Sequence, residues 1–153
     1  MIGRTRKLLK SIDARRIEDA IRAAEKRTSG EIRVSIAPLF WGNVRRQADK
    51  AFRRLGMTQT HARNGVLFFI VPSRRRFVVL GDEGIHRRVG DDFWRDIAAT
   101  MSESFRRGDF TEGIVRGVLE VGEKLAVHFP PQASRDLNEL PDEVDFGNTH
   151  KRR

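Results

Sequence analysis

Apolar residues recur every three or four positions in four blocks of the chain, and this spacing predicts four helices that each bury one face. The first helix begins after Ser11 or Asp13, whose side chains can cap it, and runs to about Thr28. The second begins after Asn43 and ends at Gly56, because glycine readily adopts the backbone conformation that stops a helix.

The other two helices lie in the second half of the chain. One begins at Asp91 or Asp92, where acidic side chains favour the positive end of a helix, and it ends near Gly108. The last helix begins at Asp109 or Thr111, and its apolar residues Phe110, Ile114, Val118, Val121 and Leu125 point inward.

Three shorter segments have the pattern of β-strands. Apolar and polar residues alternate over 31–36, which is typical of a strand with one polar face. The segment 66–71 is apolar throughout, which indicates a central strand covered on both faces. A short basic turn separates it from the strand 77–80, so we expect these two strands to form an antiparallel hairpin.

The order of these elements predicts an α/β fold. The first two strands are joined through a helix and should be parallel, whereas the third returns beside the second. A small mixed sheet with helices on both faces, an α/β/α sandwich, satisfies this order. We assign residues 11–129 to this domain, residues 1–10 to a basic flexible N-terminus, and residues 130–153 to an extended tail that is first acidic and then basic.

The composition restricts the chemistry that this domain can perform. A chain of 153 residues is long enough for one domain with its own core. It contains no cysteine, so disulfides, thiolate metal sites and cysteine nucleophiles are excluded. No apolar segment has the length of a membrane span, and the basic start does not resemble a signal peptide. We therefore expect a cytoplasmic protein without a transmembrane segment.

The chain is strongly basic, with 30 lysine and arginine residues against 21 acidic residues and a net charge of +9. Such a charge attracts nucleic acids, anionic lipids and acidic proteins. The arginines are scattered as pairs over several elements, however, and this scatter favours a well-solvated surface over one dedicated binding patch.

Acidic residues gather at one predicted edge of the sheet. Glu31 begins the first strand, Asp82 and Glu83 follow the third, and Asp91 and Asp92 begin a helix that can return to this edge. Clustered carboxylates repel each other, and a cation between them removes this cost. Oxygen ligands suit Ca²⁺ or Mg²⁺, so all five residues are candidate metal ligands. In the alternative interpretation they only cap helices, stabilise a glycine turn or face solvent.

The opposite edge combines an aromatic residue with cations. Trp41 follows the first strand, and Arg74, Arg75 and Arg76 form the turn of the hairpin. Arginine binds phosphate and carboxylate groups through paired hydrogen bonds, so this edge is a candidate site for a phosphate or an acidic peptide. In the alternative interpretation Trp41 packs on the core and the arginines point to water.

The familiar nucleophiles of phosphatases are missing from the sequence. It contains no Asp-x-Asp motif, no cysteine and no serine elbow. Gly117, Gly122 and Lys124 lack the Gly-Lys-Ser/Thr ending of a phosphate-binding loop, and no motif indicates an organic cofactor. A phosphatase would need a metal-activated water, for which the acidic edge is the candidate.

Short motifs in a fixed order resemble the TPM domain family over about residues 12–145. They are Thr28-Ser29-Gly30-Glu31-Ile32, Asn64-Gly65-Val66-Leu67, Gly81-Asp82-Glu83-Gly84-Ile85, Phe105-Arg106-Arg107-Gly108-Asp109-Phe110, Glu112-Gly113-Ile114, His128-Phe129-Pro130 and Asn138-Glu139-Leu140-Pro141-Asp142-Glu143-Val144. The resemblance implies a compact α/β/α sandwich. The family carries a phosphatase label, and some members look like divalent-cation binders. The chain is similar to short cytoplasmic bacterial members, often encoded beside a LemA-like membrane protein.

These features favour a non-catalytic interaction module of the TPM type that binds Ca²⁺ or Mg²⁺ and no organic cofactor. Its expected partner is a LemA-like membrane protein or another acidic protein, which places the chain in the cytoplasm or at the periphery of the inner membrane. A weak metal-dependent phosphatase is the first alternative, because it would use the same carboxylates. Nucleic-acid binding through the arginine-rich segment 45–54 and the basic hairpin turn is the second.

Overall fold

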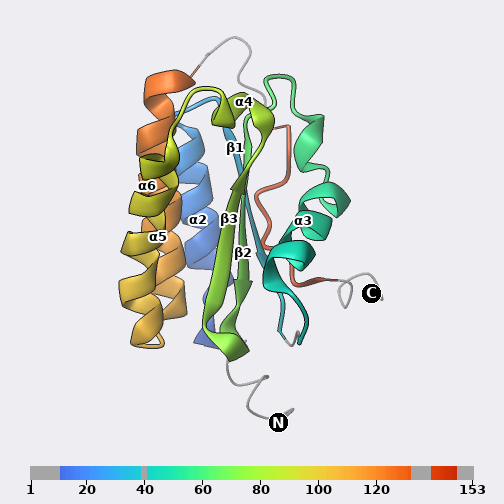
Figure 1. The fold of residues 1–153 in the computed structure, drawn as a ribbon. Helices are drawn as coiled ribbons and strands as arrows, with labels where there is room; N and C mark the ends of the chain where they lie inside the picture. Colours follow the sequence, from blue (N-terminus) through green and yellow to red (C-terminus); the bar gives the residue numbers. More distant parts are fainter. Residues whose placement is uncertain (1–10, 39–40, 132–138, 148–153) are drawn as a thin grey trace.

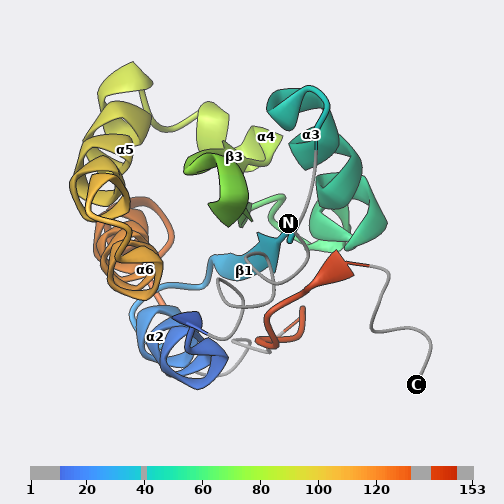
Figure 2. The same ribbon diagram turned by 90° about the horizontal axis from the view of Figure 1, so that it is seen from below.

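The computed structural model describes residues 11–38, 41–131 and 139–147, and these form three layers (Figure 1, Figure 2). The strands of the middle layer are β1 (Glu31–Ile36), β2 (Gly65–Val71) and β3 (Arg76–Gly81). The helices are α2 (Ala14–Glu25), α3 (Val44–Arg54), α4 (Glu83–His86), α5 (Asp91–Arg106) and α6 (Phe110–His128), with 3₁₀ turns η1 (Met57–Gln59) and η2 (Pro72–Arg74). Helices α2, α5 and α6 cover one face of the sheet, and α3 covers the other (Figure 2).

The central strand of the sheet is β2. It pairs in parallel with β1, where Glu31 lies opposite Gly65, and antiparallel with β3, where Val66 lies opposite Gly81. The starts of β1 and β2 and the end of β3 therefore lie at the same end of the sheet. The predicted small mixed sheet with helices on both faces is confirmed.

The helices begin where the sequence predicts them to begin. Asp13 caps α2 by accepting a hydrogen bond from the backbone N–H of Arg16 at 3.1 Å, and Asn43 caps α3 in the same way. Helix α2 ends at Glu25, earlier than predicted. Beyond its end, the hydroxyl of Thr28 donates a hydrogen bond to the carbonyl of Phe129 and accepts one from the N–H of Gly30.

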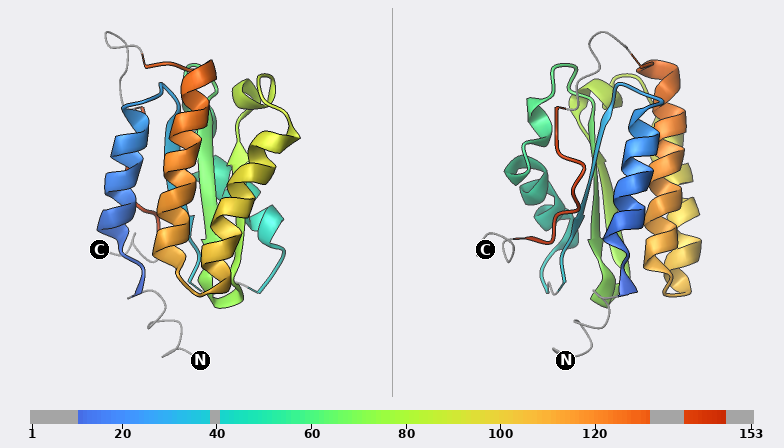
Figure 3. Two further views of the ribbon diagram at one scale, coloured as in Figure 1. Left: turned by 90° about the vertical axis from the view of Figure 1, so that its left-hand side faces the viewer. Right: turned by 180° about the vertical axis from the view of Figure 1, so that it is seen from behind.

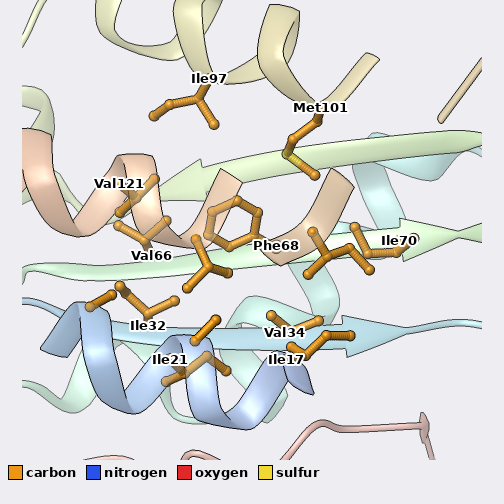
Figure 4. Close-up of a cluster of buried hydrophobic side chains, with 14 of the residues drawn as sticks. Ile17, Ile21, Ile32, Val34, Val66, Phe68, Ile70, Ile97, Met101 and Val121 are labelled. Carbon is orange, nitrogen blue, oxygen red and sulfur yellow. The ribbon is translucent and has the colours of Figure 1, made fainter. Parts of the chain in front are cut away.

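Helices α2, α5 and α6 lie side by side over the sheet (Figure 3), and the larger core lies between them and the strands (Figure 4). Phe68 of β2 lies at its centre and is fully buried. A Cβ at Gly117 of α6 would lie 2.7 Å from the sulfur of Met101 and 3.1 Å from the Phe68 ring. Only glycine therefore allows α6 to pack this closely on α5 and the sheet.

A smaller core lies on the other face of the sheet, beneath α3. Alternate residues of β2, Leu67, Phe69 and Val71, point into it. Both faces of β2 are thus covered, as its continuous apolar sequence predicts. Among the described residues, no helix is both long and apolar enough to cross a membrane.

Residues 139–147 of the predicted tail are extended but pack on the domain. Leu140 and Val144 are buried, and Asp145 forms a parallel bridge with Ser35 of β1. An extended segment that buries only two apolar residues is too short for a periodic pattern to appear in the sequence. The predicted basic N-terminus 1–10 and the basic end 148–153 lie outside the described residues.

Candidate functional site

Two of the predicted metal ligands form ion pairs with arginines of the same chain. The carboxylate of Asp82 accepts two hydrogen bonds from Arg63, at 2.6 Å and 2.9 Å, and one from the backbone N–H of Glu83 at 2.8 Å. Glu83 pairs with Arg87 at 3.0 Å. Both carboxylates are therefore neutralised without a bound cation.

The other three candidates lie on two different elements, Glu31 at the start of β1 and Asp91 and Asp92 at the start of α5. Glu31 lies at the same end of the sheet, but its Oε1 accepts a hydrogen bond from the backbone N–H of Leu140 at 3.0 Å. Asp91 and Asp92 lie exposed in the first turn of α5, where Asp92 pairs with Arg95 at 3.1 Å.

The five predicted ligands do not form a ready metal-binding group in this arrangement. Within the described ranges, no three acidic or histidine side chains come together in a group that could hold one. Ca²⁺ requires about six to eight oxygen ligands, whereas the oxygens of Asp82 and Glu31 already accept hydrogen bonds from the protein. Glu31 and Asp82 lie at the same end of the sheet, but the N–H of Leu140 and the guanidinium of Arg63 satisfy them separately, and no metal-binding group of described residues joins them to Asp91.

The edge predicted to be acidic carries instead an open cleft with a largely cationic lining. The cleft has a volume of about 530 Å³, and its charged and aromatic lining residues are His61, Arg63, Arg87, Arg88 and Phe129. The guanidinium of Arg88 lies 5.1 Å from the centre of the Phe129 ring. This edge is therefore of mixed charge.

The opposite end of the sheet carries the predicted aromatic and basic residues. Trp41 is 71% exposed, so it does not pack on the core as the alternative interpretation requires. Arg74 donates a hydrogen bond at 2.7 Å to the carbonyl of the residue after Trp41, which joins the hairpin turn to this loop. Arg75 donates to the carbonyl of Arg106 at 2.9 Å, and Arg76 is exposed. We call Trp41, Arg74, Arg75 and Arg76 the Trp41 surface.

A third region was not predicted. Residues 139–146, which we call the strap, lie along the free edge of β1 (Figure 3). The backbone N–H of Asp145 donates to the carbonyl of Val34 at 2.9 Å, and Ile36 donates to the carbonyl of Asp145 at 2.7 Å. The strap thus adds a short parallel pairing to the sheet.

The carboxylate of Asp145 ties the strap to two elements. It accepts hydrogen bonds from Arg54 of α3 at 2.8 Å and 3.3 Å, and from the hydroxyl of Ser35 at 2.8 Å. Burial acts to raise the pKa of Asp145, but Arg54 and Ser35 outweigh this effect, so the pKa lies below its ordinary value.

A buried glutamate, Glu31, and a half-buried glutamate, Glu25, lie at the other end of the strap. Burial raises the pKa of Glu31 to about 7, although the N–H of Leu140 donates to its carboxyl group and opposes the change. The pKa of Glu25 rises to about 10, because of burial and then of a hydrogen bond with Asp142. The raised pKa favours the protonated form of Glu25, and its Oε2 accepts a hydrogen bond from the N–H of Ile32 at 2.9 Å.

The fold and these regions define a class of small three-layer α/β domains with a mixed sheet. The chain belongs to the TPM domain family, whose model matches residues 4–124. Its structure is similar to the NMR structure of the BA42 protein from the psychrophilic bacterium Bizionia argentinensis, with 38% sequence identity and a TM-score of 0.83. The similarity covers 89% of this chain and 95% of that chain. No curated protein matches the chain. The predicted family is confirmed.

Sequence reasoning missed the partners of several arginines, because these partners lie far away in the chain. Arg54 and Asp145 are 91 positions apart, and no local pattern links them. Arg63 had a weak signal, since it stands directly before the predicted Asn64-Gly65 turn. Its backbone adopts the left-handed conformation there, with φ 53.

Proposed function

We propose that this TPM domain is a non-catalytic interaction module that binds an acidic partner through the Trp41 surface. The hydrogen bond from Arg74 to the carbonyl next to Trp41 carries this proposal, because it fixes a guanidinium to the loop that presents an exposed indole. Exposed aromatic side chains with arginines beside them are common centres of binding energy in protein interfaces.

The charge of the chain indicates what kind of partner this is. The net charge of +9 favours association with an acidic surface and increases the rate of encounter. Arg45 and Arg46, in the first turn of α3 close after Trp41, are exposed and add to the positive charge. We infer that the partner is a LemA-like membrane protein or another acidic protein at the inner face of a cytoplasmic membrane.

Divalent-cation binding remains a prediction for this module. Titration calorimetry with Ca²⁺ and Mg²⁺ tests it, and heat that disappears in Asp82→Ala would support it. A metal-dependent phosphatase needs the same site, and the described carboxylates do not supply it in this arrangement. We therefore develop no hydrolytic mechanism.

Fluorescence of Trp41 tests the proposed surface. In the variant Trp94→Phe, Trp41 is the only tryptophan of the sequence. This variant is titrated with polyglutamate, with duplex DNA and with vesicles containing anionic lipid. We expect polyglutamate to shift the emission to shorter wavelength and salt to weaken this binding.

The double variant Arg74→Ala/Arg76→Ala should lose the response to polyglutamate, whereas Arg95→Ala, an exposed arginine of α5, should keep it. A shift that survives Arg74→Ala/Arg76→Ala, or no shift at all, contradicts the proposal. A response to DNA alone would favour nucleic-acid binding instead.

A further inference from the structure

The strap pairs with the outer edge of β1 through backbone hydrogen bonds. A segment of another chain could form the same hydrogen bonds. The carbonyl of Val34 and the N–H of Ile36 pair with the backbone of Asp145. Any extended segment offers the same backbone groups, and an unpaired strand edge is a template for such pairing. The backbone contacts therefore specify an extended conformation but not a particular sequence.

The side chains around this edge specify the sequence of the occupant. Leu140 packs into the core beneath α3, and Val144 packs into the larger core on the other face. The next residue, Asp145, binds Arg54 and Ser35. The strap lies in a groove between β1, α2 and α3. This groove thus accepts two apolar residues four positions apart, followed directly by a carboxylate.

The strap leaves one cation of the groove incompletely satisfied. Arg33 of β1 is only 8% exposed, and its Nη2 donates to the backbone carbonyl of Glu143 at 3.1 Å. Its Nε is buried and has no hydrogen-bond partner in the described part of the chain. A buried guanidinium without full pairing is costly, and a carboxylate placed on it would remove much of this cost.

We propose that the groove between β1, α2 and α3 is a docking site for an extended acidic segment of another protein, and that the strap occupies this site in the isolated chain. The incoming segment pairs with Val34 and Ile36 as the strap does, and it places a carboxylate within hydrogen-bond distance of the unpaired Nε of Arg33. Charge complementarity identifies the occupant, because Arg33 and Arg54 both face the strap. The groove is formed by other residues than the Trp41 surface, so its test is independent of the proposed function.

Displacement of the strap is measured on the full chain with a fluorescent peptide of residues 139–147. Asp145→Ala removes the contact of the strap with Arg54 and leaves the groove intact. We expect this variant to bind the peptide at least about 10-fold more tightly than the wild-type chain, which corresponds to about 1.4 kcal/mol. Leu140→Ala weakens the strap at its other end and should give the same gain.

Two controls establish where the peptide binds. Adding Arg54→Ala to Asp145→Ala should remove the gain, because the peptide then has no guanidinium for its own aspartate. A peptide of the same composition in scrambled order should not bind. Equal affinity of wild-type and variant chains, or equal affinity of the scrambled peptide, overturns the proposal. Light scattering that shows the Asp145→Ala variant to be a dimer also overturns the proposal, because a second copy of this chain then occupies the groove.

Amide hydrogen exchange of the wild-type chain tests the same idea without a substitution. If the strap can leave while the sheet stays folded, the amide of Ile36 should exchange at least about 10-fold faster than that of Phe68 in the central strand. Equal protection of the two amides means that the strap opens only on global unfolding, and this result also overturns the proposal.

Discussion

Replacing Glu31 by glutamine tests the electrostatics of the buried carboxyl group at the start of β1. Burial raises the pKa of Glu31 from the ordinary value of 4.5 to about 7. As the pH rises through this window, the unfolded chain loses the proton while the folded chain keeps it. The stability that comes from the raised pKa is fully present below about pH 4.5 and is lost by about pH 7.

The size of the effect follows from the pKa values. One pKa unit corresponds to about 1.4 kcal/mol, so the wild-type chain should lose about 2 to 3 kcal/mol of stability between about pH 5 and about pH 8 because of this group. Glutamine at this position does not titrate. It also loses one acceptor for the backbone of the strap, but this cost is the same at both pH values and cancels in the comparison.

The assay is urea unfolding followed by circular dichroism at both pH values. The free energy of unfolding of Glu31→Gln relative to the wild-type chain should rise by about 2 to 3 kcal/mol from about pH 5 to about pH 8. Glu103→Gln, an exposed glutamate of α5, is the matched control and should show no such rise. The reasoning is refuted if Glu31→Gln and the wild-type chain have the same pH dependence.

Two further predictions concern packing and ion pairs, and thermal or urea unfolding measures both. Asp145→Ala should cost about 2 kcal/mol because it leaves a guanidinium and a buried hydroxyl unpaired, whereas Asp49→Ala, in an exposed pair, should cost less than about 0.5 kcal/mol. Equal losses contradict the role given to the strap. Gly122→Ala should cost about 1 to 3 kcal/mol, because a Cβ would lie 2.9 Å from the Cα of Ala24 in α2. Gly90→Ala, where a Cβ meets nothing within 4 Å, is the control, and an equal loss there contradicts the packing argument.

The secondary structure could be predicted because its signals are local. The continuous apolar run of β2 and the alternation in β1 indicate strands, and Asp13 and Asn43 cap helices where the apolar periodicity begins. The parallel pairing of β1 and β2 follows from the helix between them. These features depend on neighbouring residues, so the sequence by itself determines them.

The sites depended on contacts between distant positions. The sequence places Glu31 and Asp82 correctly at one end of the sheet, but it does not reveal that Arg63 neutralises Asp82. It also does not show that Asp145 returns to bind Arg54 beside β1. Whether a carboxylate is free to bind a cation depends on the donors around it, and those donors come from other elements. Composition and periodicity therefore determined the elements and their order, whereas only the tertiary structure decided which charges are paired and which strand edge is covered.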